Sequence, residues 1–248
     1  MPNTGTEAAR AAEAARGGAE KREYVRQIFS EIAPRYDLLN HVLSLNVDRA
    51  WRREALDALE WRANPGGTYL DLCAGTLDVG AALTRARGFD GLVVGADFAE
   101  PMLRAGEGKA PRRSLAPIAA DAMRLPLADA SADGAIVAFG IRNVADLDVA
   151  LREVFRVLRP AARFVILEFS TPRTALVRRF YHLYFHHVLP RIGRLVSGHR
   201  TAYTYLPRSV ASFPIEEELA RRMSGAGFAA VRWRTLSFGI AAIHVGTR

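Results

Sequence analysis

The spacing of hydrophobic and polar positions along this chain changes near residue 68. Before that point apolar residues recur at helical spacing, as in the run from Tyr24 to Ile32. Pro34 ends this helix, and a further helix is predicted over residues 48–59. After it, short apolar runs alternate with amphipathic segments. The pattern therefore predicts a helical front part followed by an α/β domain.

Short apolar runs predict five strands separated by helices, then two strands close enough to pair as a hairpin. Strands joined by helical crossovers form a parallel sheet, and a terminal hairpin adds an antiparallel strand. The predicted fold is therefore α/β and Rossmann-like, with a mostly parallel seven-stranded sheet and an N-terminal helical lid. The strands are expected at residues 69–72, 91–96, 115–119, 134–139, 163–169, 229–235 and 238–245, and helices at 78–87, 100–106, 147–158 and 216–223.

The 248 residues, half of them hydrophobic, suffice for one large domain with its own core. We expect a disordered tail over residues 1–22 and a single domain over 23–248. Within it, residues 23–66 form the helical lid and 171–215 a basic, aromatic insertion. No run approaches the ~20 apolar residues that a membrane-spanning helix needs.

The stretch from Tyr69 to Val79 reads as strand, small-residue turn and helix, the first unit of a nucleotide-binding fold. Free backbone N–H groups at the helix start favour polar or anionic ligand groups. Of the glycine positions in a G-x-G-x-G turn, only Gly75 is present. No lysine follows the turn, which excludes a triphosphate-binding P-loop. An ordinary strand-to-helix turn remains the alternative.

Polar residues follow each predicted parallel strand, where ligands of open α/β sheets bind. Asp97 closes the second strand, 22 positions after Gly75, the spacing at which an acid accepts hydrogen bonds from ribose hydroxyls. Individually such acids are commonly helix caps or turn residues. Together, acids after the first three strands indicate a nucleoside. The polar residues after the first to the fifth strand are, in order, Asp71 and Thr76, Asp97, Asp121, Arg142 and Asn143, and Glu168 and Ser170.

Both NAD and S-adenosylmethionine carry an adenosine. The pyrophosphate of NAD needs close approach to the glycine turn. Leu77 stands at the third glycine position, which disfavours a dinucleotide. The antiparallel final strand is also typical of methyltransferases.

Four motifs resemble those of the demethylmenaquinone and ubiquinone C-methyltransferases, over residues 25–246. The resemblance implies a class I methyltransferase fold and S-adenosylmethionine as cofactor, held by Thr76, by Asp97 at the ribose, and by the pair Asp121 and Ala122 around the adenine. The turn and strand-end positions described above add Gly75 and Asp71 to the expected cofactor site. The motifs begin with Tyr36-Asp37-x-Leu39-Asn40-x-x-Leu43-Ser44, with Trp51 after it. They continue with Phe139-Gly140-Ile141-Arg142-Asn143, then Arg156 to Pro160 leading into Leu167 to Ser170, and end with His187 to Gly193.

The sequence also departs from that family's pattern. Ala138 replaces a common serine, Asp48 a common histidine, and Ala161-Ala162 a Gly-Gly turn. If the backbone at Leu77 has positive φ, the leucine costs of the order of 1 kcal/mol or more.

The resemblance implies transfer of a methyl group to a ring carbon of a prenylated demethylquinol, with demethylmenaquinol as the expected substrate. Arg142 and Asn143 are then expected to position substrate or water, and Tyr36 is a further catalytic candidate. A salt bridge for Arg142 and a lid-core position for Tyr36 are the alternatives. His182, His186 and His187 lack cysteine or acid neighbours, so no metal site is expected.

Between Thr171 and Ile215 the sequence has seven arginines and no acid, interleaved with aromatics. Three interpretations compete: contact with an anionic membrane surface, nucleic-acid binding, and a solvated face or homodimer interface. We favour the first and third. The first 23 residues lack the apolar block of a secretory signal, and a single cysteine suits a reducing compartment. A cytoplasmic enzyme at the inner face of the membrane is therefore expected.

Alternative functions remain at this stage: methylation of another small molecule or of RNA, or a non-catalytic scaffold whose cofactor loop has drifted.

Overall fold

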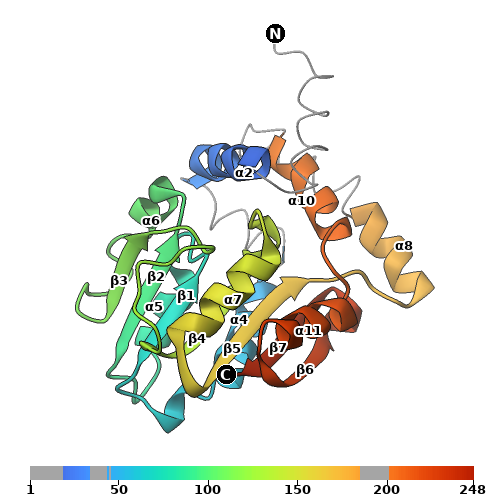
Figure 1. The fold of residues 1–248 in the computed structure, drawn as a ribbon. Helices are drawn as coiled ribbons and strands as arrows, with labels where there is room; N and C mark the ends of the chain where they lie inside the picture. The colour runs from blue at the N-terminus through green and yellow to red at the C-terminus, as the bar shows by residue number, and fades with distance from the viewer. Residues whose placement is uncertain (1–18, 34–43, 45, 185–200) are drawn as a thin grey trace.

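A twisted seven-stranded sheet forms the centre of the protein, in a computed structural model that describes residues 19–33, 44, 46–184 and 201–248 (Figure 1). The strand order is β3-β2-β1-β4-β5-β7-β6. The first five strands pair in parallel, and β7 runs antiparallel to both neighbours. The predicted fold is confirmed. The strands are β1 Thr68–Leu72, β2 Leu92–Asp97, β3 Leu115–Ala119, β4 Ala132–Ala138, β5 Leu158–Phe169, β6 Ala229–Leu236 and β7 Ala241–Thr247.

The helices follow the predicted order, with shifts at their ends. The first crossover helix ends at Thr84, three residues before its predicted end. The helices are α2 Ala19–Ile32, α4 Val47–Ala58, α5 Asp78–Thr84, α6 Glu100–Gly106, α7 Leu147–Val157, α8 Ala175–Leu183, α10 Thr201–Ala211 and α11 Glu216–Gly225, and short 3-10 turns are η2 Trp61–Ala63, η3 Ile141–Asn143 and η5 Ser237–Gly239.

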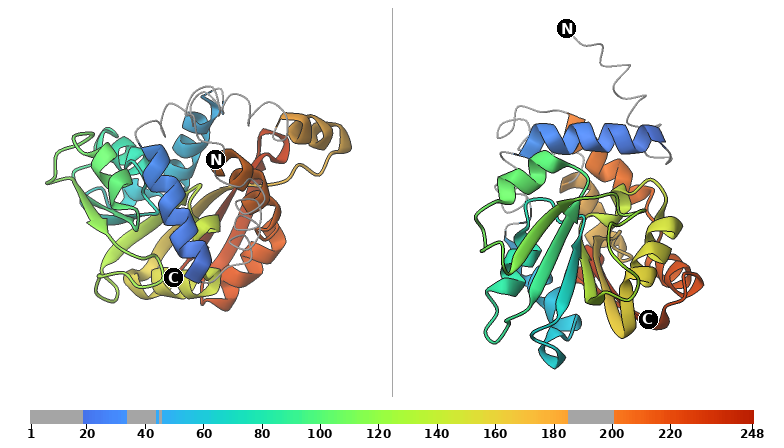
Figure 2. Two further views of the ribbon diagram at one scale, coloured as in Figure 1. Left: turned by 90° about the horizontal axis from the view of Figure 1, so that it is seen from above. Right: turned by 60° about the vertical axis from the view of Figure 1, so that its left-hand side comes forward.

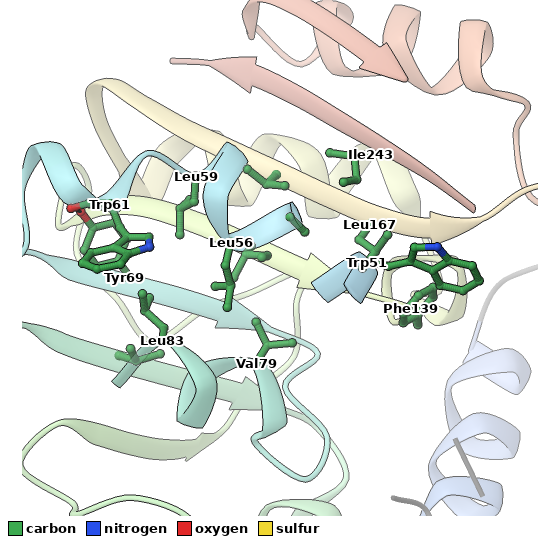
Figure 3. Close-up of a cluster of buried hydrophobic side chains, with 14 of the residues drawn as sticks. Trp51, Leu56, Leu59, Trp61, Tyr69, Val79, Leu83, Phe139, Leu167 and Ile243 are labelled. Carbon is green, nitrogen blue, oxygen red and sulfur yellow. Dashed lines mark hydrogen bonds between the residues drawn. The ribbon is translucent and has the colours of Figure 1, made fainter. Parts of the chain in front are cut away.

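Alternate residues of β1 enter two separate hydrophobic layers, because successive side chains of a strand point to opposite faces. Tyr69 packs on the face covered by α4 and α5. Leu70 and Leu72 pack on the face covered by α7 and α11. Figure 3 shows the first layer, where Trp51 of α4 lies beside Phe139, with ring centroids 6.0 Å apart. Both faces of the sheet are therefore buried, as a parallel sheet requires.

The structure divides the predicted lid into two parts. α4 packs on the sheet through Trp51, Ala55 and Leu56 and belongs to the core. α2 instead lies across the end of the sheet where the parallel strands finish, in contact with α6, η3 and α10 (Figures 1 and 2). It begins at Ala19, before the predicted domain boundary at residue 22. Burial of three α2 side chains, Val25, Ile28 and Ile32, explains why the helix is held there.

The basic segment contains α8 and α10. α8 lies away from the sheet in Figure 1, whereas α10 packs beside α2. In the part of the chain that the structure describes, no helix has the length and apolar character needed to cross a bilayer.

Candidate cofactor and substrate site

The turn after β1 is built from left-handed residues. Cys73, Gly75 and Leu77 have φ of 51°, 52° and 65°. This conformation turns the chain sharply into α5, whose first residue is Asp78. A leucine at such a position is strained, as the sequence suggested.

Asp97 fixes this turn to the end of β2. Its carboxylate accepts hydrogen bonds from the backbone N–H of Gly75 and of Ala99, each at 2.8 Å. Burial raises the pKa of the Asp97 carboxyl, and the backbone hydrogen bonds oppose that rise. The side chain lines a cavity and retains acceptor capacity there, because each carboxylate oxygen can accept more than one bond.

This cavity, the cofactor cavity below, lies between the ends of β1, β2 and β4 and the helix α2. Asp121, Ala122 and Asn143 reach it together with Gly75 and Asp97, so the structure brings together five of the predicted site residues. Its other lining residues are Arg22, Phe29, Cys73, Ala96, Phe98, Met102, Ala120, Met123, Ala138, Phe139, Gly140, Val144 and Ala145.

Sequence reasoning missed the contribution of α2 to this cavity. Arg22 pairs with Asp121 at 3.1 Å and closes the cavity on the side of β3, and Phe29 also lines it. No local signal marks Arg22, which falls inside the predicted tail. The apolar stripe of an amphipathic helix shows which of its positions are buried, but it does not show which strand ends the helix covers.

Asp71 and Thr76 lie beside the cofactor cavity without lining it. Asp71 accepts a hydrogen bond from the backbone N–H of Gly80 at 2.8 Å, and its side chain is fully buried. Desolvation raises the pKa of its carboxyl to about 7. Thr76 is also buried, and its carbonyl lies against Gly106. Both hold the turn in shape, and their contact with a cofactor stays a prediction.

Arg142 and Asn143, adjacent in η3, face different surroundings. The Arg142 guanidinium forms a buried ion pair with Glu168 at 2.7 Å and also donates to the carbonyl of Phe139. Burial raises the pKa of the Glu168 carboxyl, and Arg142 opposes that rise. Asn143 lines the cofactor cavity, and its buried Oδ1 has no hydrogen-bond partner among the described residues.

The single cysteine also lines the cofactor cavity. Burial raises the pKa of the Cys73 thiol well above its ordinary value, and the carboxylates of Asp97 and Asp71 add to the rise. The thiol is therefore protonated at neutral pH and unsuited to nucleophilic catalysis.

Several predicted positions lie outside the described residues: Tyr36, Asp37, Asn40, His186 and the motif from His187 to Gly193. Within the described part of the chain, no group of His, Cys, Asp and Glu side chains is arranged to hold a metal ion.

The residues present fit an adenosine cofactor. Acids at the ends of β2 and β3, Asp97 and Asp121, offer the hydrogen-bond acceptors that a ribose and an adenine would need. Gly140 also lines the cavity, and its lack of a side chain makes room for Cys73, since a Cβ there would lie 2.4 Å from that of Cys73. The cavity therefore has the acceptors of a nucleoside site.

Comparison with known proteins agrees with this geometry. The sequence model described as the ubiE/COQ5 methyltransferase family matches residues 18–248. A Thermus thermophilus protein named demethylmenaquinone methyltransferase is 48% identical over 223 residues, 89% of this chain and 100% of that protein. The Deinococcus radiodurans protein of that name is 48% identical over 92% of this chain and 94% of its own. A Geobacter sulfurreducens protein, ubiquinone/menaquinone biosynthesis C-methyltransferase UbiE, is 44% identical over 92% and 90%.

Solved structures show the same fold at low identity. A SAM-dependent methyltransferase from Thermotoga maritima, described as a possible histamine N-methyltransferase, has a TM-score of 0.60 at 20% identity, covering 89% of this chain and 98% of its own. The [4+2]-cyclase SpnF has a TM-score of 0.66 at 17% identity, covering 90% and 95%.

Proposed function

The chain belongs to the ubiE/COQ5 methyltransferase family, and from this premise we propose that it methylates a ring carbon of a prenylated demethylquinol, converting demethylmenaquinol to menaquinol. It is an S-adenosylmethionine-dependent methyltransferase. The observation that carries the choice of substrate is the 48% identity, over about nine-tenths of the chain, to two proteins named demethylmenaquinone methyltransferase. The relative named for both quinones is 44% identical.

The cofactor cavity supports this proposal. In this proposal Asp97 accepts hydrogen bonds from the ribose hydroxyls, and Asp121 and Ala122 contact the adenine; all three line the cofactor cavity. When bound, S-adenosylmethionine supplies a methyl group already activated on a sulfonium. The protein therefore has mainly to orient the acceptor and exclude water.

Asn143 and Arg142 have separate roles in the proposed reaction. The free Oδ1 of Asn143 can accept a hydrogen bond from the quinol hydroxyl or from a water that takes its proton. In this proposal the guanidinium of Arg142, held in place by Glu168, stabilises the phenolate that develops as the quinol loses its proton. Tyr36 remains a catalytic candidate outside the described residues.

The test is methyl transfer from labelled S-adenosylmethionine to demethylated naphthoquinol and benzoquinol in parallel. The proposal expects transfer to the naphthoquinol, and Asn143→Ala lowering kcat with cofactor affinity kept. Transfer to the benzoquinol alone would overturn the choice of substrate. Failure of both quinols with cofactor binding intact would overturn quinol methylation and favour another small molecule or RNA. Failure to bind the cofactor would favour the scaffold.

We further propose that the enzyme works at the inner face of an anionic membrane. The turn between β6 and β7 lies at the cofactor end of the sheet, because Phe169 pairs with Ala241. Phe238 in this turn is 85% exposed, and Leu183 at the end of the basic helix α8 is 54% exposed. Exposed apolar side chains beside arginines suit a bilayer that carries the prenylated substrate.

Co-sedimentation with anionic liposomes, set against an RNA gel shift, tests this location. Phe238→Ser should weaken liposome binding. RNA binding without liposome binding would reverse the assignment. Self-association of the enzyme without liposome binding would instead assign residues 171–215 to a homodimer interface.

A further inference from the structure

A second cavity, of about 200 Å³, adjoins the cofactor cavity. Val144 and Ala145 line both. Two neighbouring residues of α2 line different cavities: Lys21 lines the second cavity and Arg22 lines the cofactor cavity. Its polar side chains come from α2, η3, α10 with the residue just after it, and α11: they are Lys21, Arg142, Tyr205, Ser209, Ser212 and Arg222.

The charge in this second cavity is positive and not fully compensated. Arg142 is paired with Glu168, and Arg222 with Asp148 and Glu218. Lys21 donates a hydrogen bond to the backbone carbonyl of Arg142 at 2.9 Å, and no described carboxylate pairs with it. Desolvation and the neighbouring Arg142 charge lower the pKa of Lys21 to about 8. An anion beside Lys21 would offset the cost of holding this ammonium group charged.

The polar groups of the second cavity that are still able to form a hydrogen bond are donors. The hydroxyl groups of Ser209 and Ser212 donate to the backbone carbonyls of Leu206 and Arg208 in α10. The buried hydroxyl of Tyr205 has no hydrogen-bond partner among the described residues. A buried hydroxyl without a hydrogen-bond partner is unfavourable, so a ligand that accepts its hydrogen bond is favoured. The remaining donors are therefore the Lys21 ammonium and the Tyr205 hydroxyl.

We propose that this second cavity binds a phosphate group, either the free ion or the phosphate of a lipid headgroup. Several acceptor oxygens and negative charge on one compact group match an ammonium and a hydroxyl donor on facing helices. The net charge of +8 favours the approach of anions. The proposal does not depend on which quinol is methylated.

Phosphate in this cavity is coupled to cofactor binding through α2. A phosphate held by Lys21 and Tyr205 ties α2 to α10. The next residue, Arg22, pairs with Asp121 across the cofactor cavity. Fixing α2 therefore fixes the cover of the cofactor cavity, and each ligand is expected to tighten the binding of the other.

Calorimetric titration of the full chain with S-adenosylmethionine, with and without inorganic phosphate at constant ionic strength, tests the proposal. We expect phosphate to tighten cofactor binding about fivefold and to raise Tm. Lys21→Met and Tyr205→Phe should each remove both effects. Arg26→Met is the matched control, because it removes an exposed charge from the same helix and should keep them.

Vesicles of phosphatidylglycerol, compared with phosphatidylcholine, identify the source of the phosphate. An effect of phosphatidylglycerol that is lost in Lys21→Met, with none from the free ion, assigns a lipid headgroup. An effect of inorganic phosphate alone assigns the free ion. No effect of either probe on the wild-type protein, or an effect that Lys21→Met retains, overturns the proposal.

Discussion

The side chain of Leu77 fills the space that Gly95 leaves open in β2. A Cβ at Gly95 would lie 2.5 Å from Cδ2 of Leu77, and one at Gly106 would lie 3.0 Å from its Cγ. Leu77 is buried despite its left-handed backbone. Burial of this apolar side chain offsets the strain of its left-handed backbone. The missing glycine at position 77 is therefore compensated by Gly95 and Gly106, which leave room for the leucine side chain.

Gly95→Ala is expected to destabilise the fold by about 1–3 kcal/mol through overpacking against Leu77. Leu77→Gly relieves the backbone strain but removes a buried side chain, so it also destabilises. The double variant should lose at least about 1 kcal/mol less than the sum, since the new methyl enters the vacated space. Urea unfolding of the four proteins measures this coupling. Strict additivity would contradict the proposed contact.

Asp97→Ala is expected to weaken S-adenosylmethionine binding of the order of 100-fold. The change removes the acceptor proposed for the ribose and the partner of the Gly75 N–H, and hydrogen bonds to charged groups contribute about 1.5–3 kcal/mol. Isothermal titration gives the affinity, with the exposed acid Asp90→Ala as control. Equal affinities for wild type and Asp97→Ala would remove Asp97 from the cofactor site.

Asp71 is expected to make stability depend on pH. Its pKa is about 7 in the folded protein and near 4 when unfolded, so the folded state binds more protons between these values. The contribution is fully present below pH 4 and is lost as the pH rises through 7, by up to about 4 kcal/mol. Asp71→Asn keeps an acceptor for Gly80 but cannot ionise.

Urea unfolding of wild type and Asp71→Asn at pH 5 and pH 8 measures this difference. At pH 8 the Asp71→Asn variant should gain stability relative to wild type. At pH 5 the difference in unfolding free energy between the two proteins should be smaller. A constant difference across this range would mean that Asp71 does not titrate in it.

Arg142→Ala is expected to reduce stability as well as activity. It leaves the buried carboxylate of Glu168 without its ion-pair partner, a change that costs about 3–5 kcal/mol at buried sites. Arg142→Ala combined with Glu168→Gln should recover much of the stability but not the turnover. Thermal unfolding and kcat measured on the same proteins separate the two effects. Recovery of full turnover in the double variant would give Arg142 a purely structural role.

Arg22→Ala is expected to speed cofactor dissociation several-fold with little change in Tm. Arg22 is largely exposed, and its ion pair with Asp121 holds α2 across the cofactor cavity. Exposed ion pairs contribute little to stability, about 1 kcal/mol at most. Stopped-flow displacement of the cofactor measures the rate, with Arg26→Ala on the same helix as control. An unchanged rate would show that α2 does not restrain the cofactor.

Local sequence patterns determined the sheet and the ends of its strands. Period-two and continuous apolar runs depend only on side chains near each other in the chain, so five parallel strands and a terminal hairpin were predictable. Acids that follow parallel strands must gather at one edge of the sheet. For this reason Asp97 and Asp121 could be placed at the cofactor cavity from the sequence.

Only the tertiary structure decided which side chains meet across long sequence separations. Packing of helices onto the sheet brings together three pairs that no sequence periodicity links: Arg22 with Asp121, Arg142 with Glu168, and Leu77 with Gly95. The same packing placed α4 in the core and α2 over the cofactor cavity, although both read as amphipathic helices. A helix stripe records that one face is buried, and the surface that buries it is fixed by the rest of the chain.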